Sequence, residues 1–223
     1  MLNLLHAIWQ ADSAFPSGAF AFSGGLEGLA ALGAQPGRAA LAAIMRDVLL
    51  CRWGSADCVA LLRAHGASGD LDRIAAADAA LDAATLAAPL REGSRRNGAA
   101  LLTAHVRLGR AEARRLQRAQ AEGCLHGHLA VMQGALFRDL GLDAHAAIAA
   151  AGYAMLAALA AASVRLGCIG AIEAQSALAA TLPLLAGLAA DPPQADAPIE
   201  GFLPLLDLAA MRHARADMRL FAN

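Results

Sequence analysis

Apolar residues recur along this chain at the spacing of amphipathic helices. Large apolar side chains follow one another three, four or seven positions apart, which places them on one face of a helix. Strict alternation, which is typical of a half-buried strand, occurs only at Ala19-Phe20-Ala21-Phe22 and is too short to outweigh its surroundings. β-branched residues are scarce, and alanine, the best helix former, is abundant. The pattern predicts an all-α protein, a single globular bundle of about eight to ten helices.

Capping and helix-breaking residues divide this pattern into segments. Asp70 and Asp143 can cap helices, and Pro89 can open one, because the first turn tolerates a missing N–H. The two alanine-rich helices late in the chain are apolar almost all round and are expected to be central. Helices with both ends predicted are 2–11, 38–51, 71–87, 112–121, 124–140, 169–188 and 203–220. The helix 38–51 is expected to continue, or to kink near Gly54, into 55–65. Three further helices are predicted by one end only: one ends near Gly33, one begins at Pro89 and one follows Asp143.

A proline-rich segment interrupts the helical pattern near the end of the chain. Residues 191–198 read Asp-Pro-Pro-Gln-Ala-Asp-Ala-Pro, which cannot continue a helix. We therefore expect a helical core domain over 1–190, a proline-rich linker over 191–198, and over 199–223 a C-terminal helix and docking tail of the same domain.

The least ordinary stretch runs from Asp12 to Glu27. Pro16 and Gly18 predict a turn, Phe15, Phe20 and Phe22 gather around it, and Ser17 can cap the helix that follows. Glycines 24, 25 and 28 leave that helix a bare face, where another backbone can approach closely. A buried first helical hairpin with a tight turn accounts for these features, and a docking surface is the alternative.

Composition excludes several functional classes. The net charge of −1 offers no electrostatic footprint for nucleic acid. The chain contains no lysine, which excludes a P-loop nucleotide-binding site and a Schiff-base enzyme. The four cysteines are scattered, and the N-terminal residues do not resemble a signal peptide. Together these two features predict reduced thiols and a cytoplasmic location. Two apolar runs, 144–164 and 174–190, approach the length of a membrane span, but their alanine content and the charges between them favour soluble helices.

One compact group of potential metal ligands is present. Cys124, His126 and His128 lie within five positions, and in the predicted helix 124–140 Cys124 and His128 would share a face while His126 points elsewhere. Two ligands, Cys124 and His128, make an incomplete site, so a core cysteine with a surface histidine is favoured. The alternative is a nickel- or zinc-binding helical protein that uses Cys124, His126 and His128. No paired carboxylates or other pattern indicates an enzyme, and no cofactor is expected.

The end of the chain combines arginines with large apolar residues. Arg212, Arg215 and Arg219 would line one face of the last helix, where they complement the helix dipole. The chain then reaches Leu220 and Phe221, although chain ends are usually polar. Docking to a partner and packing against the protein itself both explain such a tail.

These terminal features resemble those of the UreF family of urease accessory proteins. The opening stretch is similar to the family's N-terminal signature at Pro16, Gly18, Ala19, Phe20 and the run Gly25-Leu26-Glu27, with departures at Phe22 and Gly24. The segments 91–98 and 163–170, which contain Arg95 and Arg165, resemble two internal motifs, with a departure at Ala171. His213 and the run Arg219-Leu220-Phe221 match the C-terminal motif, with a departure at Ala222.

The resemblance implies an all-α, usually dimeric, cytosolic chaperone that is not itself an enzyme. It would bind the accessory protein UreD (also called UreH) and the GTPase UreG, and act with them on apo-urease so that nickel enters under control of GTP hydrolysis. No membrane or nucleic-acid partner is implied. Residues from the matching motifs and the arginine-rich tail are the expected partner-binding residues: Pro16, Gly18, Phe20, Phe22, Glu27, Arg95, Arg165, Arg212, His213, Arg215, Arg219, Leu220 and Phe221.

Overall fold

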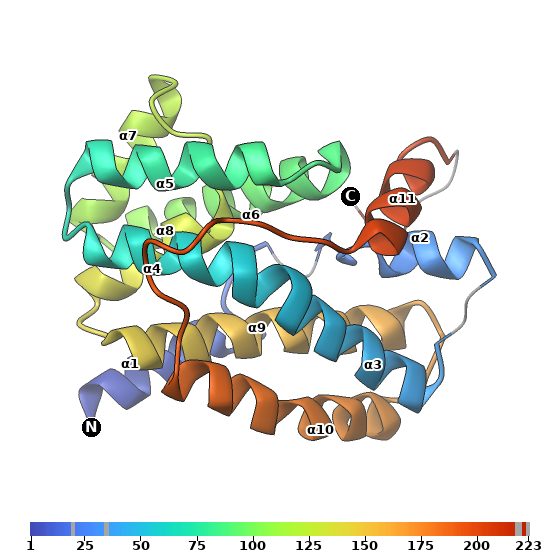
Figure 1. Ribbon diagram of the computed structural model, residues 1–223. Coiled ribbons are helices and arrows are strands. Elements are labelled where there is room, and N and C mark those ends of the chain that lie inside the picture. The colour runs from blue at the N-terminus through green and yellow to red at the C-terminus, as the bar shows by residue number, and fades with distance from the viewer. Residues whose placement is uncertain (19–20, 34–35, 217–219, 222–223) are drawn as a thin grey trace.

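The computed structural model describes residues 1–18, 21–33, 36–216 and 220–221 (Figure 1). These residues fold into helices without a strand, which confirms the predicted all-α class. The helices are α1 (Leu2–Ala11), α2 (Leu26–Ala31), α3 (Arg38–Val48), the π-helix η2 (Leu49–Asp57), α4 (Cys58–Gly66), α5 (Leu71–Ala84), α6 (Ala88–Arg107), α7 (Ala111–Ala121), α8 (Leu129–Asp139), α9 (Ala144–Arg165), α10 (Ala171–Ala190) and α11 (Pro204–His213).

One long helical rod replaces two of the predicted helices. Helices α3, η2 and α4 follow one another without a break from Arg38 to Gly66, as the predicted continuation near Gly54 allows. The widened π-helical turns lie where the kink was expected, and Gly54 sits inside them. Counted with this rod as one, the described part of the chain holds ten helical rods, within the predicted number.

Helix α9 forms the centre of the bundle. It packs against α1, α10, α8, α2, α3, η2 and α4, and its inner face buries Ile148, Leu156 and Leu159. Helix α8 packs on α4 on one side and on α6 on the other, and α7 in turn contacts α6 (Figure 1). Most of the core is aliphatic, and its large aromatic members are Phe15, Trp53, Phe137 and Phe221.

The predicted caps form as expected. The carboxylate of Asp70 accepts hydrogen bonds from the N–H groups of Asp72 and Arg73 at 3.0 and 3.2 Å, and that of Asp143 accepts from Ala146 N–H at 2.8 Å. Pro89 lies in the first turn of α6. Local sequence signals therefore fix where α5, α6 and α9 begin.

Three predictions about helices are wrong. Helix α8 begins at Leu129 instead of residue 124, because Gly123 and Gly127 adopt φ values of +79° and +83° and break the helical path. Helix α11 ends at His213 instead of Leu220. Helix α10 packs on α9 and α3 but exposes Ile172, Leu182 and Leu184, so it lies at the edge of the bundle and not at its centre.

Two helices have the length and hydropathy of a membrane span. These are α9, with a mean hydropathy of 1.9, and α10, with 1.3. In α9 this composition is that of a core helix, because seven other elements pack around it. Two such helices are weak grounds for a membrane protein.

The proline-rich segment after α10 crosses the molecule and places α11 beside α2 (Figure 1). The guanidinium of Arg63 donates hydrogen bonds to the carbonyls of Ala195 and Ala197 at 2.7 and 2.8 Å. The N–H groups of Glu200 and Phe202 then donate to two carbonyls of η2, Ser55 at 3.3 Å and Cys51 at 2.9 Å. The segment is thus tied to the bundle, and α11 is held at one end of the molecule.

Candidate partner-binding site

Helices α2 and α11 make an unusually close contact. A Cβ atom on Gly28 would lie only 2.3 Å from the carbonyl oxygen of Ala209, so no residue larger than glycine fits without displacing backbone. Gly25, the N-cap of α2, has a φ of +93°, and a Cβ there would meet Leu206 at 2.8 Å. The predicted bare face of α2 is confirmed, and the backbone that approaches it belongs to α11.

A buried carboxylate, that of Glu27, lies where α2 meets the C-terminal segment. It accepts hydrogen bonds from the backbone N–H groups of Leu220 and Phe221, the second at 3.2 Å. The Nε2 atom of His213 lies 3.0 Å from its Oε2 atom, and both side chains are more than nine-tenths buried. Because an uncompensated buried carboxylate is costly, the two backbone donors and the nearby histidine ring are what allow Glu27 to lie inside. We call Glu27, His213, Leu220 and Phe221 the terminal cluster.

Arg165 closes the terminal cluster from a third element. It is the last residue of α9, and its guanidinium carbon lies 4.2 Å from the centre of the Phe221 ring. This is a cation–π contact. Phe221 is 4% exposed, so the contact is made at the edge of the core. Three segments that the sequence could only mark separately, around Glu27, Arg165 and Phe221, therefore meet.

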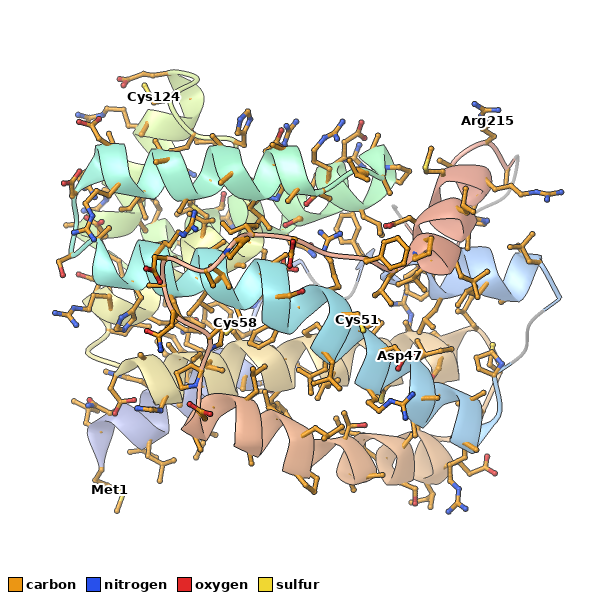
Figure 2. The ribbon with its side chains drawn as sticks, viewed as in Figure 1. Met1, Asp47, Cys51, Cys58, Cys124 and Arg215 are labelled. Atoms are coloured by element: carbon orange, nitrogen blue, oxygen red, sulfur yellow. The ribbon has the colours of Figure 1, made fainter. Side chains whose placement is uncertain are left out.

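Around the terminal cluster lies a surface that is both apolar and basic. Arg212 and Arg215 are exposed, and Arg215 lies just beyond the last residue of α11 (Figure 2). Leu220 is 57% exposed although its neighbour Phe221 is buried. Large apolar side chains cover the outer face of α11 and the segment before it: Phe202, Leu205, Leu208 and Met211. We call these residues, with Arg212, Arg215 and Leu220, the α11 surface.

The opening stretch contributes less to this surface than expected. Pro16 is exposed, and Gly18 is half-buried with a φ of +78°, which confirms that a glycine is needed in this turn. Phe22 turns inward, because its ring lies 3.0 Å from the Cβ position of Gly93 on α6. Phe20 and Arg219 lie outside the described residues. The expected cap at Ser17 is wrong, since α2 begins at Leu26, and Ser23 instead accepts a hydrogen bond from Glu27 N–H at 3.3 Å.

Arg95 does not belong to the terminal cluster. Its guanidinium pairs with Asp82 on α5, the Nε atom donating at 2.8 Å. Burial acts to raise the pKa of Asp82, but hydrogen bonds from His128 and Arg95 outweigh it and hold that pKa below its usual value. This network joins α5, α6 and the start of α8. Contacts within the protein therefore explain the position of Arg95, and no docking partner is needed to explain it.

The structure overturns the interpretation of the Cys124 to His128 group. These residues form a loop, where Cys124 and His126 are exposed and His128 is fully buried, the reverse of a core cysteine with a surface histidine. His128 is already engaged, with Nε2 at 2.8 Å from Asp82 and Nδ1 at 3.0 Å from Ser94. Cys124 also lies far from Cys51 and Cys58 (Figure 2). Across the described residues no three His, Cys, Asp or Glu side chains are grouped as metal ligands would be.

The fold and the α11 surface define an all-helical protein in which the C-terminal segment joins α2 beneath an exposed apolar and basic face. Comparison with known proteins then identifies the family. The UreF family model matches residues 37–182. The chain belongs to the UreF family of urease accessory proteins.

Individual relatives extend the match over almost the whole chain. A urease accessory protein UreF of Cereibacter sphaeroides is 35% identical over 221 residues, which cover 98% of this chain and 97% of the relative. One from Methylorubrum populi is 32% identical over 230 aligned positions and covers all of both chains. One from Trichodesmium erythraeum is 30% identical over 216 residues, 95% of this chain and 93% of the relative. The complete coverage includes α2, α11 and the tail, which lie beyond the family model.

Proposed function

We propose that this protein is a non-catalytic chaperone of urease maturation that acts in the cytoplasm through protein–protein contacts. It would form a complex with UreD (UreH) and the GTPase UreG, and that complex would act on apo-urease so that nickel is inserted under control of GTP hydrolysis. Membership of the UreF family and the helical fold support this proposal. The particular partners follow from the resemblance in the terminal motifs.

The observation that carries the proposal is the α11 surface. Four large apolar side chains there are between 48% and 77% exposed: Phe202, Leu205, Leu208 and Met211. Exposed apolar patches rimmed by polar groups are typical of interaction sites, and arginine is enriched at such sites. Arg212 and Arg215 provide the charged rim, and the terminal cluster beneath holds the surface in place. The docking role of Leu220, Arg212 and Arg215 is thus supported by their exposure, whereas Glu27, His213, Arg165 and Phe221 would support docking from below.

Charge reversal tests the docking role without removing the tail. We expect Arg212→Glu combined with Arg215→Glu to weaken co-purification with UreD or UreG by about tenfold or more, since a hot-spot arginine commonly contributes 2 kcal/mol or more. The matched control is Arg114→Glu, an exposed arginine on α7, away from α11 (Figure 1). Separate pull-downs with each partner show which one uses this surface.

Truncation after Ala210 is the complementary experiment. It removes His213, Leu220 and Phe221 but leaves the rest of the bundle, so the helical circular dichroism should be largely kept while partner binding is lost. Normal assembly of both the truncated chain and the double charge reversal with UreD and UreG would refute docking through the α11 surface. Urease activation in cells that lack their own UreF relates the binding result to function.

A further inference from the structure

An open pocket lies where the opening stretch, η2, α6, α8, α9 and the start of α11 come together. Its volume is about 220 Å³. Large apolar side chains that are only half-buried line it from five of these segments: Phe22, Leu90, Leu129, Met155 and Leu203. A cavity of roughly 150 Å³ is enough for one benzene molecule, so this pocket has room for an aromatic ring with a short chain attached.

Three charged residues line the same pocket and give it a net negative charge. Arg52 and Asp57 belong to η2 and form an ion pair at 3.3 Å, and the Arg52 guanidinium also donates to Thr85 Oγ1 at 2.9 Å. The charge of Arg52 is therefore balanced within η2. Asp207 is the third charged residue, and it adds a negative charge that this pair does not neutralise.

The Asp207 carboxylate has no direct partner. The residue is half-buried in the first turn of α11, and its side chain forms no hydrogen bond or ion pair within the described part of the chain. Burial raises the pKa of this carboxyl above its usual value, and the nearby charge of Arg52 opposes the rise only in part. A partly desolvated carboxylate is stabilised when a cation binds beside it. The pocket thus joins an apolar wall to an unpaired negative group.

We propose that this pocket binds a small organic cation, a primary ammonium group carried by a short chain on an aromatic ring. The ring packs against Phe22 and Met155, since aromatic and thioether side chains both make favourable contacts with aromatic rings. The ammonium group pairs with the Asp207 carboxylate. None of the α11 surface residues lines the pocket, so the site is separate from the proposed docking surface. Its existence does not depend on the proposed function.

Ligand-observed NMR on the full chain at pH 7 tests the site with 2-phenylethylammonium as the probe. We expect saturable binding, about fivefold tighter than that of 2-phenylethanol, which has the same shape without the charge. This difference is the effect of one partly exposed ion pair. The anion 3-phenylpropionate, which reverses the charge, should bind more weakly than the alcohol.

Two variants separate the charge from the wall. Asp207→Asn should weaken 2-phenylethylammonium about fivefold and leave 2-phenylethanol unchanged, because it removes only the charge. The matched control is Glu122→Gln, an exposed carboxylate just after α7 and outside the pocket, which should bind both compounds as the wild type does. Ala158→Phe places a ring in the pocket from α9 and should abolish binding of both compounds, even if Asp207→Asn fails to fold.

Four results would overturn the proposal. These are no saturable binding of 2-phenylethylammonium by the wild type, equal binding of the alcohol, an ammonium preference that survives in Asp207→Asn, and wild-type binding by Ala158→Phe. The docking variant, Arg212→Glu combined with Arg215→Glu, should retain the probe affinity of the wild type. Failure of this site and failure of the proposed docking are therefore distinguishable.

Discussion

At the scale of single residues, Glu27 links α2 to the C-terminal segment. Its two oxygens take the N–H groups of Leu220 and Phe221 and face His213, so one carboxylate joins α2 to the chain end. Glu27→Gln keeps the shape but turns one oxygen into a donor that faces other donors. We expect a loss of about 1–3 kcal/mol in the local stability of the tail, with little change in helix content.

Hydrogen exchange of the peptides that contain α11 and Phe221 measures this effect. Exchange should accelerate in Glu27→Gln and stay unchanged in the control Glu92→Gln, whose side chain is exposed at 59%. Equal exchange in the wild type and Glu27→Gln would show that the hydrogen bonds to Glu27 do not hold the tail.

The lowered pKa of a second residue, His105, predicts how the free energy of unfolding changes with pH. Burial, helped by Arg110, lowers its pKa to about 4 in the folded protein, against about 6.5 unfolded. Between these values the unfolded chain binds the additional proton, so stability is complete above pH 6.5 and falls as the pH drops toward 4. The shift corresponds to roughly 3 kcal/mol at the acid end of this window.

His105→Gln removes this titration and keeps a hydrogen-bonding group beside Gln10. Urea unfolding at pH 7, 5.5 and 4.5 should therefore show a shallower loss of stability in His105→Gln than in the wild type. The exposed His126→Gln serves as control and should follow the wild type. A variant whose stability falls with pH as steeply as that of the wild type would contradict the assignment.

At the scale of elements, the contact between α2 and α11 depends on Gly28. Alanine favours a helix over glycine by up to about 1 kcal/mol, so on propensity alone Gly28→Ala would stabilise α2. The Cβ would lie 2.3 Å from the carbonyl oxygen of Ala209, which is backbone and cannot rotate away. We expect the clash to prevail and to cost about 1–3 kcal/mol, the usual cost of overpacking.

Gly187→Ala provides a matched control on α10. A Cβ there has no neighbour within 4 Å, so the substitution should be neutral or stabilising by about 0.5–1 kcal/mol. Thermal unfolding and hydrogen exchange of α11 distinguish the two variants. An unchanged α11 in Gly28→Ala would mean that the two helices can separate without cost.

The same elements show what could be predicted from the sequence. The helix starts at Asp70, Pro89 and Asp143 were predicted correctly. They depend on hydrogen bonds or steric effects between residues close in sequence, which can be recognised from the sequence alone. The loop before α8 was missed because apolar spacing continues through it, and only the positive φ values of Gly123 and Gly127 break the helix. A central position was predicted for α10 because its residues are apolar almost all round. An apolar composition shows that a helix can be buried, but it does not show which other helices pack against it.

The candidate site shows the same division. Sequence motifs marked Glu27, Arg165, His213 and Phe221 individually, but no local signal could reveal that Glu27 binds a backbone 193 positions further along the chain. Their meeting is a property of tertiary packing. Conversely, Arg95 looked available for docking because its partner Asp82, thirteen positions away on another helix, is not recognisable from spacing.

For the whole molecule, a second apolar surface remains to be accounted for. Helix α1 packs on α9 through one side, while Leu2, Leu4, Leu5 and Ile8 are between 54% and 62% exposed. A groove between α1, α9 and α10, lined largely by alanine, runs beside them. Self-association buries the same patch on both copies and leaves the α11 surface free for other partners. We call Leu2, Leu4, Leu5 and Ile8 the α1 surface, and we predict that a second copy of this chain covers it in a homodimer.

Charged substitutions on α1 test this arrangement. Leu5→Glu combined with Ile8→Glu should convert a dimer into a monomer, since two buried carboxylates per copy would lack partners. Light scattering coupled to size exclusion measures the mass, and Leu108→Glu, an exposed leucine just after α6, is the control. If the variant remains dimeric, the dimer contact does not lie on α1, and the α11 surface is then the next candidate for it. If the monomeric variant still binds UreD or UreG, the two surfaces act independently, whereas joint loss would show that docking requires both copies.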